Sequence, residues 1–319
     1  MQFATISIDG LSVHLGLVLP EARILDLTAA VPDDEAFASM LDLIRAGDRG
    51  LERARRQLER IDADRAEASR QVIGLDQVQL QAPIPRPQKN VFCVGMNYRS
   101  HVEQNARARG IRPEVGEVPL FFTKPTTAVI GPGEPILLDK RLTRKLDWEV
   151  ELGVVIGRGG TWIAESEALD HVFGFTLIND VSARDLQWRT SQMFIGKGLD
   201  SYCPIGPWVV ERSETVDGSG FELICRVNAE EHQRDSTANL IFPIPRIIAE
   251  LSKGLTLEPG DIIATGTPGG CGYQLTPPQF LSVGDVVECE AEGIGRLANP
   301  VAPWSSHRVP SAMVLEATR

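Results

Sequence analysis

The sequence predicts a mainly β fold with some helix, in which a small α+β unit precedes a larger, strand-rich domain. Short runs of β-branched and apolar residues, bounded by Gly, Pro, Asn or Asp, recur along most of the chain. Helical spacing of apolar residues is confined to a few stretches. A chain of 319 residues suits one large domain with a smaller appendage, which we place at residues 86–319 and 1–85.

The small amino-terminal unit combines strands and helices. Its first thirty residues predict short strands broken at residues 9–10 and 20–21, where turn formers interrupt alternating apolar residues. Apolar residues then recur at helical spacing, namely Phe37, Met40, Leu41 and Ile44, followed by Leu51, Leu58 and Ile61. We therefore expect two helices between residues 33 and 71, the second with a charged, solvated face. Three prolines within residues 82–87 predict an extended connector after this unit.

The larger domain is rich in strands and glycine. Eight segments read as strands: NVFCVG, PLFFTK, VELGVVIG, FGFTLIND, WVV, FELICRVN, DIIATG and DVVECEAEG. Two helices are expected to interrupt them, one from Tyr98 to Arg109 and one from Pro245 to Lys253, and the second should end at Gly254. This pattern predicts a mainly β domain.

Composition excludes several classes of protein. The 43 acidic and 32 basic residues give a net charge of −11, which disfavours binding to nucleic acids and anionic membranes. The five cysteines are scattered without a C-x-x-C pair, so neither a disulfide framework nor a zinc site is expected. The amino terminus lacks the features of a signal peptide, and no apolar run approaches the roughly 20 residues of a membrane span. We expect a cytoplasmic protein.

Three carboxylates stand out in the larger domain. Glu149 and Glu151 alternate along one predicted strand, so they project from the same face roughly 7 Å apart. The apolar residues that follow indicate that this strand enters the core, although a solvent-facing strand is the alternative. Asp180 ends another apolar strand, where it serves either as a ligand or as a helix cap. Three carboxylates without a nearby His or Cys favour Mg²⁺ or Mn²⁺.

Cationic side chains and one histidine complete the predicted site. His101 follows a glycine turn and has the pKa range of a general base, although a lone histidine is more often structural. Lys124 and Lys197 are flanked by apolar or glycine residues and are candidates for binding a carboxylate or an enolate. The loop 266–270 lacks the Gly-Lys-Ser/Thr ending of a nucleotide-binding loop. Its backbone N–H groups and the Thr267 hydroxyl are expected to face a substrate carboxylate.

Seven short motifs occur in an order that resembles the fumarylacetoacetate hydrolase family, from about Lys89 to Val301. The motifs are Gly95-Met96-Asn97-Tyr98, Thr123-Lys124-Pro125, Asp147 to Glu151, Asn179-Asp180 with Arg184-Asp185-Leu186-Gln187, Gly196-Lys197, Ala264-Thr265-Gly266-Thr267-Pro268 and Gly293-Ile294-Gly295. The amino-terminal unit looks like the small variable domain of many members.

The resemblance implies a twisted β-sandwich roll, usually dimeric, that binds Mg²⁺ or Mn²⁺ and acts on a small anionic dicarbonyl acid. Members cleave carbon–carbon bonds of acylpyruvates, decarboxylate oxaloacetate, or interconvert enol and keto forms. Their common step is chelation of an α-keto acid by the metal, which stabilises an enolate. The resemblance assigns metal ligation to Glu149, Glu151 and Asp180, catalysis to His101 and Lys197, and substrate binding to Lys124, Arg184, Gln187 and Thr267.

One position departs from the hydrolytic members of the family. They often pair the helix histidine with a Glu three residues later, whereas here that position is Gln104 and the acid is Glu103, on another face of a regular helix. The first prediction is a metal-dependent hydrolase that cleaves a carbon–carbon bond in an acylpyruvate-like 2,4-dioxo acid of the fumarylacetoacetate or fumarylpyruvate type. The departure favours the alternative, an enol–keto isomerase or an oxaloacetate-type decarboxylase. A non-catalytic binding protein is a third hypothesis, disfavoured by the retained carboxylates, His101 and Lys197.

Overall fold

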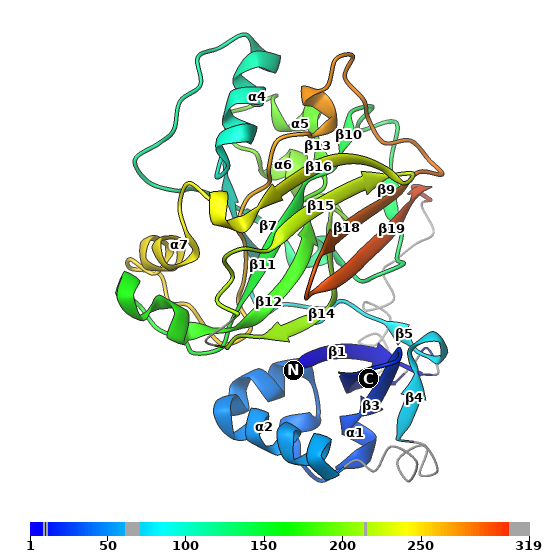
Figure 1. The fold of residues 1–319 in the computed structure, drawn as a ribbon. Helices are drawn as coiled ribbons and strands as arrows, with labels where there is room; N and C mark the ends of the chain where they lie inside the picture. The colour runs from blue at the N-terminus through cyan, green and yellow to red at the C-terminus, as the bar shows by residue number, and fades with distance from the viewer. Residues whose placement is uncertain (9, 11, 61–70, 214–215, 306–319) are drawn as a thin grey trace, which may run out of the picture.

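The structure, a computed structural model, describes residues 1–8, 10, 12–60, 71–213 and 216–305. A small amino-terminal unit lies against one end of a larger domain (Figure 1). The last part of the second predicted helix, including Ile61, falls outside the described residues. No helix among the described residues is long and apolar enough to span a bilayer.

The amino-terminal unit contains strands and helices, as its sequence predicts. Its elements are β1 (Gln2–Ser7), β2 (Val13–Leu19), β3 (Arg23–Asp26), α1 (Leu27–Ala30), η1 (Glu35–Phe37), α2 (Met40–Arg60), β4 (Val72–Gly74), η2 (Leu75–Gln77) and β5 (Gln79–Leu80). The two predicted helices are the two halves of α2, because Gly47 interrupts it with φ 55° and ψ −138°. A positive φ of this kind is readily available only to glycine.

The two units share one sheet. Strand β1 pairs in antiparallel fashion with β14 (Cys203–Glu211), where Phe3 lies opposite Val209. A single cluster of buried side chains also joins Phe3 and Phe37 of the small unit to Phe173 of the larger one. Both the sheet and this core therefore contain residues from before and after position 85. The division into units 1–85 and 86–319 stays a prediction.

The larger domain is built from two sheets around a common core. The large sheet continues from β14 through β12 (Val172–Asn179), β11 (Val150–Ile156), β17 (Ile262–Ala264), β6 (Val91–Gly95) and β7 (Leu120–Lys124). A five-stranded sheet has the order β16 (Glu230–Ser236), β15 (Glu222–Val227), β18 (Val286–Ala291), β19 (Gly295–Pro303) and β9 (Ile136–Leu138). Buried residues of both sheets, such as Phe175, Leu223 and Leu297, belong to one core cluster. The predicted mainly β fold is confirmed.

Helices and short elements gather at one end of these sheets (Figure 1). They are α4 (Arg99–Arg109), α5 (Arg184–Gln187), α6 (Phe194–Lys197), η6 (Gly272–Gln274) and the strand pair β10 (Leu146–Asp147) and β13 (Ser182–Ala183). Elsewhere lie β8 (Val129–Ile130), η3 (Thr126–Ala128), η4 (Glu165–His171), η5 (Thr237–Asn239) and α7 (Ile244–Leu251). Both helices predicted for this domain are present, as α4 and α7, but α7 ends at Leu251 rather than at the expected Gly254. The candidate site lies where α4, α5, α6 and η6 meet the ends of β11 and β12.

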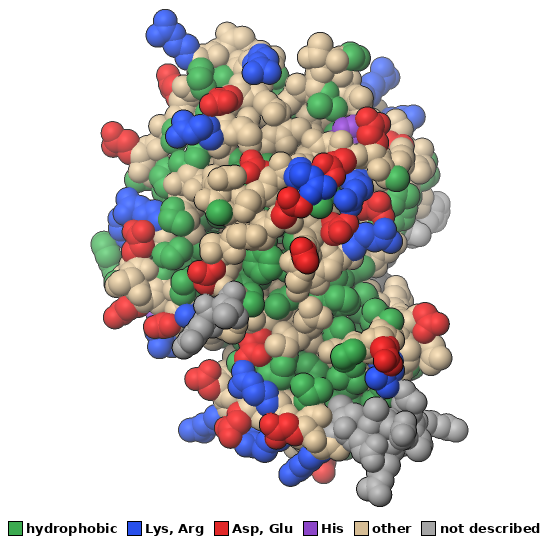
Figure 2. Space-filling model, viewed as in Figure 1, with side chains coloured by type: hydrophobic (Ala, Val, Ile, Leu, Met, Phe, Trp, Pro, Cys, Tyr) green, Lys and Arg blue, Asp and Glu red, His purple; other side chains and the backbone are tan. Residues whose placement is uncertain are grey.

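The exterior agrees with the charge pattern of the sequence. On the face shown in Figure 2, basic and acidic side chains are interspersed rather than gathered by sign. Over β15 and β16, for example, Arg226 pairs with Glu290 at 2.5 Å, and Arg234 pairs with Glu231 at 2.5 Å. Surface pairs of this kind contribute little to stability, but they leave no broad basic surface on this face for a polyanion.

Candidate active site

Two buried strands bring the three predicted carboxylates together. Val150 of β11 lies opposite Asn179 of β12, so Glu149 and Asp180 are neighbours where the strand pair ends. The Asp180 N–H donates to the Glu149 carbonyl at 2.8 Å. All three side chains are buried, and Glu149, Glu151 and Asp180 each offer an oxygen within 4.8 Å of the others. The fold therefore concentrates three acids at one point of the core.

Three buried cations face these acids. Lys197 of α6 lies 2.9 Å from Glu149 and 2.7 Å from Asp180. Lys124, at the end of β7, forms an ion pair with the other oxygen of Asp180. Arg184 of α5 lies 2.6 Å from Glu149. Since buried charges are stable only when paired, the predicted lysines and arginine are structural partners of the acids.

The acids differ in their electrostatic surroundings. Burial acts to raise the pKa of Glu149, but Lys197 and Arg184 outweigh it and hold that pKa well below its usual range. Burial and the charges of Asp180 and Glu149 raise the pKa of Glu151 well above its usual range. Its carboxylate accepts a 2.8 Å hydrogen bond from the Gly266 N–H, and no cation pairs with it among the described residues. Glu151 is therefore the acid that needs a further positive charge.

The donor set fits a divalent cation. Three carboxylate oxygens close enough to share one ion form a hard oxygen site, which suits Mg²⁺ or Mn²⁺ better than zinc or copper. A bound cation would also supply the charge that Glu151 lacks. Glu149, Glu151 and Asp180 are the residues that would hold it.

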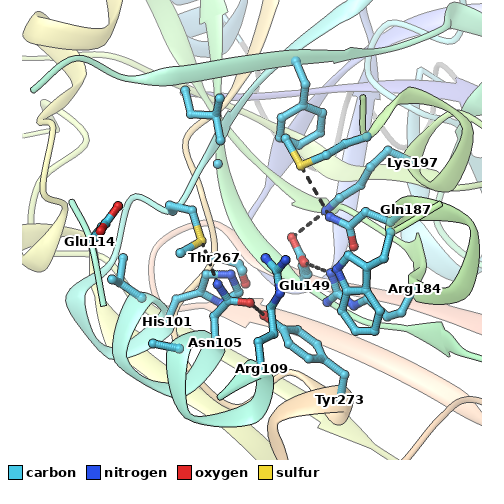
Figure 3. A pocket seen from close by; sticks show the side chains of 18 of the residues that line it. His101, Asn105, Arg109, Glu114, Glu149, Arg184, Gln187, Lys197, Thr267 and Tyr273 are labelled. Atoms are coloured by element: carbon cyan, nitrogen blue, oxygen red, sulfur yellow. Dashed lines mark hydrogen bonds and ion pairs between the residues drawn. The ribbon is translucent and has the colours of Figure 1, made fainter. Parts of the chain in front are cut away.

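A cavity of about 410 Å³ opens beside the carboxylates (Figure 3). Seven of the nine predicted site residues line it, namely His101, Glu149, Glu151, Arg184, Gln187, Lys197 and Thr267. Lys124 and Asp180 are fully buried and are not among the lining residues. Lys124 thus supports Asp180 from within the core, which differs from the substrate contact expected for it.

Arg184 is fixed by partners that the sequence did not single out. Asp147 accepts from Arg184 Nε at 2.8 Å and from the Gly272 and Tyr273 N–H groups at 2.7 and 3.1 Å. The guanidinium lies 4.3 Å from the Tyr273 ring centroid, a cation–π contact. Its Nη2 is buried and has no partner among the described residues. Arg184 is therefore held in place at the cavity wall by Asp147 and Tyr273.

Gln187 and Lys197 depend on a close approach of two short helices. Gln187 accepts from Arg184 Nη1 at 3.1 Å, which orients its amide at the cavity. A Cβ at Gly196 would lie only 2.4 Å from the Gln187 backbone nitrogen. Only glycine permits this packing of α5 against α6, which places Lys197 next to Gln187.

His101 lies on the opposite wall, on α4, with neutral partners. Its Nδ1 is 3.2 Å from Gln274 Nε2 and 3.7 Å from Cys271 Sγ. The Gln274 carbonyl accepts from the Gly270 and Cys271 N–H groups, so the amide nitrogen faces the ring and donates to Nδ1. Burial lowers the pKa of His101 to about 4, although the charge of Glu149 acts in the opposite direction. The imidazole is neutral at pH 7.

The residues beside His101 in the sequence do not reach it. Gln104 accepts a 2.7 Å hydrogen bond from the Gly270 N–H, and the side chain of Glu103 is exposed on another face of α4. Among the described residues, no carboxylate hydrogen-bonds His101. Gln274, which the sequence motifs did not include, occupies the position of its partner.

The loop 266–270 uses its polar groups inside the protein. The Thr267 hydroxyl donates to the Val150 carbonyl at 2.9 Å and accepts from Gln233 at the same distance. The Gly269 N–H donates to Ser100 at 3.1 Å. Together with the bonds from Gly266 and Gly270, these contacts fix Glu151 and α4. The Thr267 hydroxyl was expected to donate to a substrate carboxylate. In the structure its single proton is donated to the Val150 carbonyl instead.

Comparison with known proteins agrees with this architecture. The family model described as fumarylacetoacetate (FAA) hydrolase C-terminal matches residues 90–302. The chain is 41% identical over 307 residues to oxaloacetate tautomerase YisK of Bacillus subtilis, covering 94% of this chain and 100% of that protein.

Two solved structures are also similar. A fumarylacetoacetate hydrolase from Exiguobacterium antarcticum has a TM-score of 0.79 and 36% identity, covering 95% of this chain and all of that one. Maleylpyruvate hydrolase from Sphingobium sp. SYK-6, in complex with a manganese(II) ion and pyruvate, has a TM-score of 0.72 and 29% identity, covering 96% and 100%. The chain therefore belongs to the fumarylacetoacetate hydrolase family of enzymes.

Proposed function

We propose that the protein is a divalent-metal-dependent tautomerase that interconverts the enol and keto forms of a small 2-oxo dicarboxylic acid of the oxaloacetate type. The observation that carries the proposal is the neutral His101, whose Nδ1 accepts from the Gln274 amide rather than facing a carboxylate. This choice places the isomerase alternative above the carbon–carbon hydrolase first expected from the sequence.

Tautomerisation requires two proton movements and no water. A proton is added at carbon 3 of the enol, and another leaves the enol oxygen. Bound at Glu149, Glu151 and Asp180, Mg²⁺ or Mn²⁺ would polarise the 2-oxo acid as a Lewis acid. We propose that Lys197 Nζ donates the proton that is added at carbon 3. Lys197 lines the cavity, and its Nζ lies within 2.9 Å of two of these carboxylates. The proton it gives to carbon 3 is replaced by the one that leaves the oxygen.

The surroundings of Lys197 keep its amine protonated. Burial acts to lower its pKa, but Asp180 and Glu149 raise the pKa above its usual range, so the amine carries its proton at pH 7. Its positive charge also stabilises negative charge that develops on the substrate oxygen.

Hydrolysis makes a different demand on His101. Water must lose a proton to the imidazole, and a carboxylate beside the ring stabilises the imidazolium that forms. Here the Gln274 amide donates to Nδ1, which keeps the ring proton on Nε2 and offers no compensating charge. Glu149, whose charge does act on His101, is already shared between Lys197 and Arg184. His101 is therefore a poor base for deprotonating water.

The comparisons support the choice of substrate and metal. The Bacillus subtilis relative is named an oxaloacetate tautomerase, and the Sphingobium enzyme was solved with manganese(II) and pyruvate, a 2-oxo acid. We extend both to this chain as proposals, together with the homodimeric state and cytoplasmic location expected from the sequence. The metal remains Mg²⁺ or Mn²⁺.

A direct assay compares two reactions on the same metal-loaded enzyme. Enol-oxaloacetate should lose its ultraviolet absorbance far faster with enzyme than in buffer, and a chelator should remove the acceleration. Cleavage of an acylpyruvate should proceed with a much lower kcat/KM. If the acylpyruvate is cleaved at least as efficiently as the enol is converted, the protein is a hydrolase and the proposal is wrong.

A further inference from the structure

The cavity face of α4 carries one polar side chain per turn. His101, Asn105 and Arg109 are spaced four residues apart and all three line the cavity. Residues at this spacing share one face of a helix, and each step advances about 6 Å along its axis. Side chains on a helix lean toward its amino terminus, so Arg109 leans toward His101 rather than away from the site. Figure 3 shows its guanidinium extending toward the cavity.

The first two members of this row are fixed by neighbours. His101 is held by Gln274, as described above, and Asn105 accepts a 3.0 Å hydrogen bond from the Tyr273 hydroxyl. Arg109 has no hydrogen bond or ion pair within the part of the chain that the structure describes, and it is exposed at the mouth of the cavity. Its positive charge is therefore not neutralised by any acid among the described residues.

The other cations near the carboxylates are already paired. Lys197 faces Glu149 and Asp180, and Arg184 faces Glu149 and Asp147. A substrate with two carboxylates brings a second negative charge that these groups do not neutralise. Arg109 lines the same cavity as Glu149 and Glu151, but from the last turn of α4 rather than from the strands. We place the far end of a bound four-carbon acid beside it. A guanidinium suits this role because its planar donors match a carboxylate in pairs.

We propose that Arg109 binds the distal carboxylate of the substrate and makes the enzyme selective for dicarboxylic over monocarboxylic 2-oxo acids. The inference rests on the proposed function, because it assumes that the 2-oxo acid end of the substrate lies at Glu149, Glu151 and Asp180. It adds a substrate-binding group that the sequence motifs did not include.

The chain offers a matched control. Arg107 also lies in the last turn of α4, is exposed, and does not line the cavity. Both arginines lie in the last turn, near the carboxyl-terminal end of the helix dipole, so a general effect of charge on the helix affects both. A role in the cavity affects Arg109 alone. Arg112, a second exposed cation that lines the cavity after α4, is the competing candidate.

The test measures binding without turnover. Malate and 2-hydroxybutyrate share a 2-hydroxy acid end, but only malate has a distal carboxylate. We expect calorimetry on the Mn²⁺-loaded enzyme to show that the wild type binds malate about tenfold more tightly, the value of one partly solvated charge-assisted contact. Arg109→Met should remove this preference by weakening malate alone, whereas Arg107→Met should preserve it. Melting curves check that each variant is folded.

Several results would overturn the assignment. If the preference for malate survives Arg109→Met, or if Arg112→Met removes it instead, another group binds the distal carboxylate. Equal weakening of both ligands shows a general effect on the site. The enol-oxaloacetate assay is separate: a preference dependent on Arg109 in an enzyme that does not tautomerise leaves the inference standing and rejects the proposed function.

Discussion

The two walls of the cavity are built differently. The strand wall, formed by β11, β12 and the short helices α5 and α6, holds buried acids and cations in ion pairs of 2.6 to 2.9 Å. The helix wall, formed by α4 and η6, holds His101 and Asn105 through neutral hydrogen bonds and ends in the exposed Arg109. We infer that the strand wall supplies chemistry shared across the family, whereas the helix wall selects the reaction and the substrate.

The largest effect should come from removing an acid that pairs with buried lysines. Asp180→Asn leaves Lys124 and Lys197 without one of their partners, so we expect the free energy of unfolding to fall by about 3 to 5 kcal/mol, as when a buried ion pair is broken. Metal binding should be lost as well. Denaturant unfolding of the metal-free protein measures the first effect.

Glu151→Gln is the matched control on the same wall. The amide oxygen can still accept from the Gly266 N–H, and no buried cation loses a partner, so the metal-free protein should keep its stability while losing affinity for metal. If both substitutions destabilise the metal-free protein equally, the strand wall is not organised around the two lysines as described.

The next effect separates the two lysines. Lys197→Met should lower kcat/KM by a factor that corresponds to about 2 to 4 kcal/mol of transition-state stabilisation, in addition to the stability lost with its ion pairs, because this side chain lines the cavity. Lys124→Met should chiefly reduce stability, because Lys124 lies behind Asp180 and away from the cavity. Steady-state kinetics and melting curves on both variants distinguish these outcomes. An unchanged kcat/KM for Lys197→Met removes it from the reaction.

The helix wall makes a prediction about pH. The pKa of His101 is lowered to about 4, so the ring stays neutral as pH falls from 8 to 5, and activity should show no acid limb near the usual value of about 6.5. Protonation is disfavoured in the folded state, so the unfolded chain binds more protons between about pH 4 and 6.5. His101 therefore contributes stability above the unfolded pKa that is lost as pH falls. A limb near 6.5 that disappears in His101→Asn contradicts the neutral assignment.

The smallest effect is expected at Glu103. Its side chain is exposed on α4 and does not contact His101, so Glu103→Gln should change kcat/KM less than about twofold, as for an ordinary surface position. The measurement is the same tautomerisation assay. A large loss of activity in this variant alone would mean that α4 rearranges during turnover and brings Glu103 to the ring.

The strand wall could be predicted largely from the sequence. Alternation placed Glu149 and Glu151 on one face, and an acid after an apolar strand identified Asp180; all three meet in the structure. The eight predicted strands are present, but others of the same domain, such as β16 (EEHQRDS) and β19 (GRLANPVAP), were missed. The polar residues of β16 lack an apolar pattern. Its place is set by pairing with β15, a long-range contact that local sequence does not encode.

The helix wall could be predicted only in part. The position of His101 on a helix followed from the sequence, but its partner Gln274 is 173 residues away along the chain. The buried Asp147, which anchors Arg184 and η6, was visible as part of a motif without a recognisable role. Such contacts arise where loops from distant segments converge, and periodicity carries no information about them.

The most direct test of the account adds a carboxylate to the helix wall. Glu at position 274 would keep the bonds from the Gly270 and Cys271 N–H groups and place a negative charge beside His101 Nδ1. Nδ1 would then carry the ring proton and leave Nε2 free to accept one from water. Gln104→Glu is the control, because Gln104 faces the Gly270 N–H rather than His101.

The measurement is kcat/KM for acylpyruvate cleavage by the metal-loaded wild type and the two variants. We predict that Gln274→Glu raises this kcat/KM about tenfold or more, which is a fraction of what a well-placed general base provides. Gln104→Glu should leave kcat/KM near the wild-type value. If Gln274→Glu binds metal, is folded and gains no cleavage activity, the neutral partner of His101 does not decide between tautomerisation and hydrolysis, and the account is contradicted.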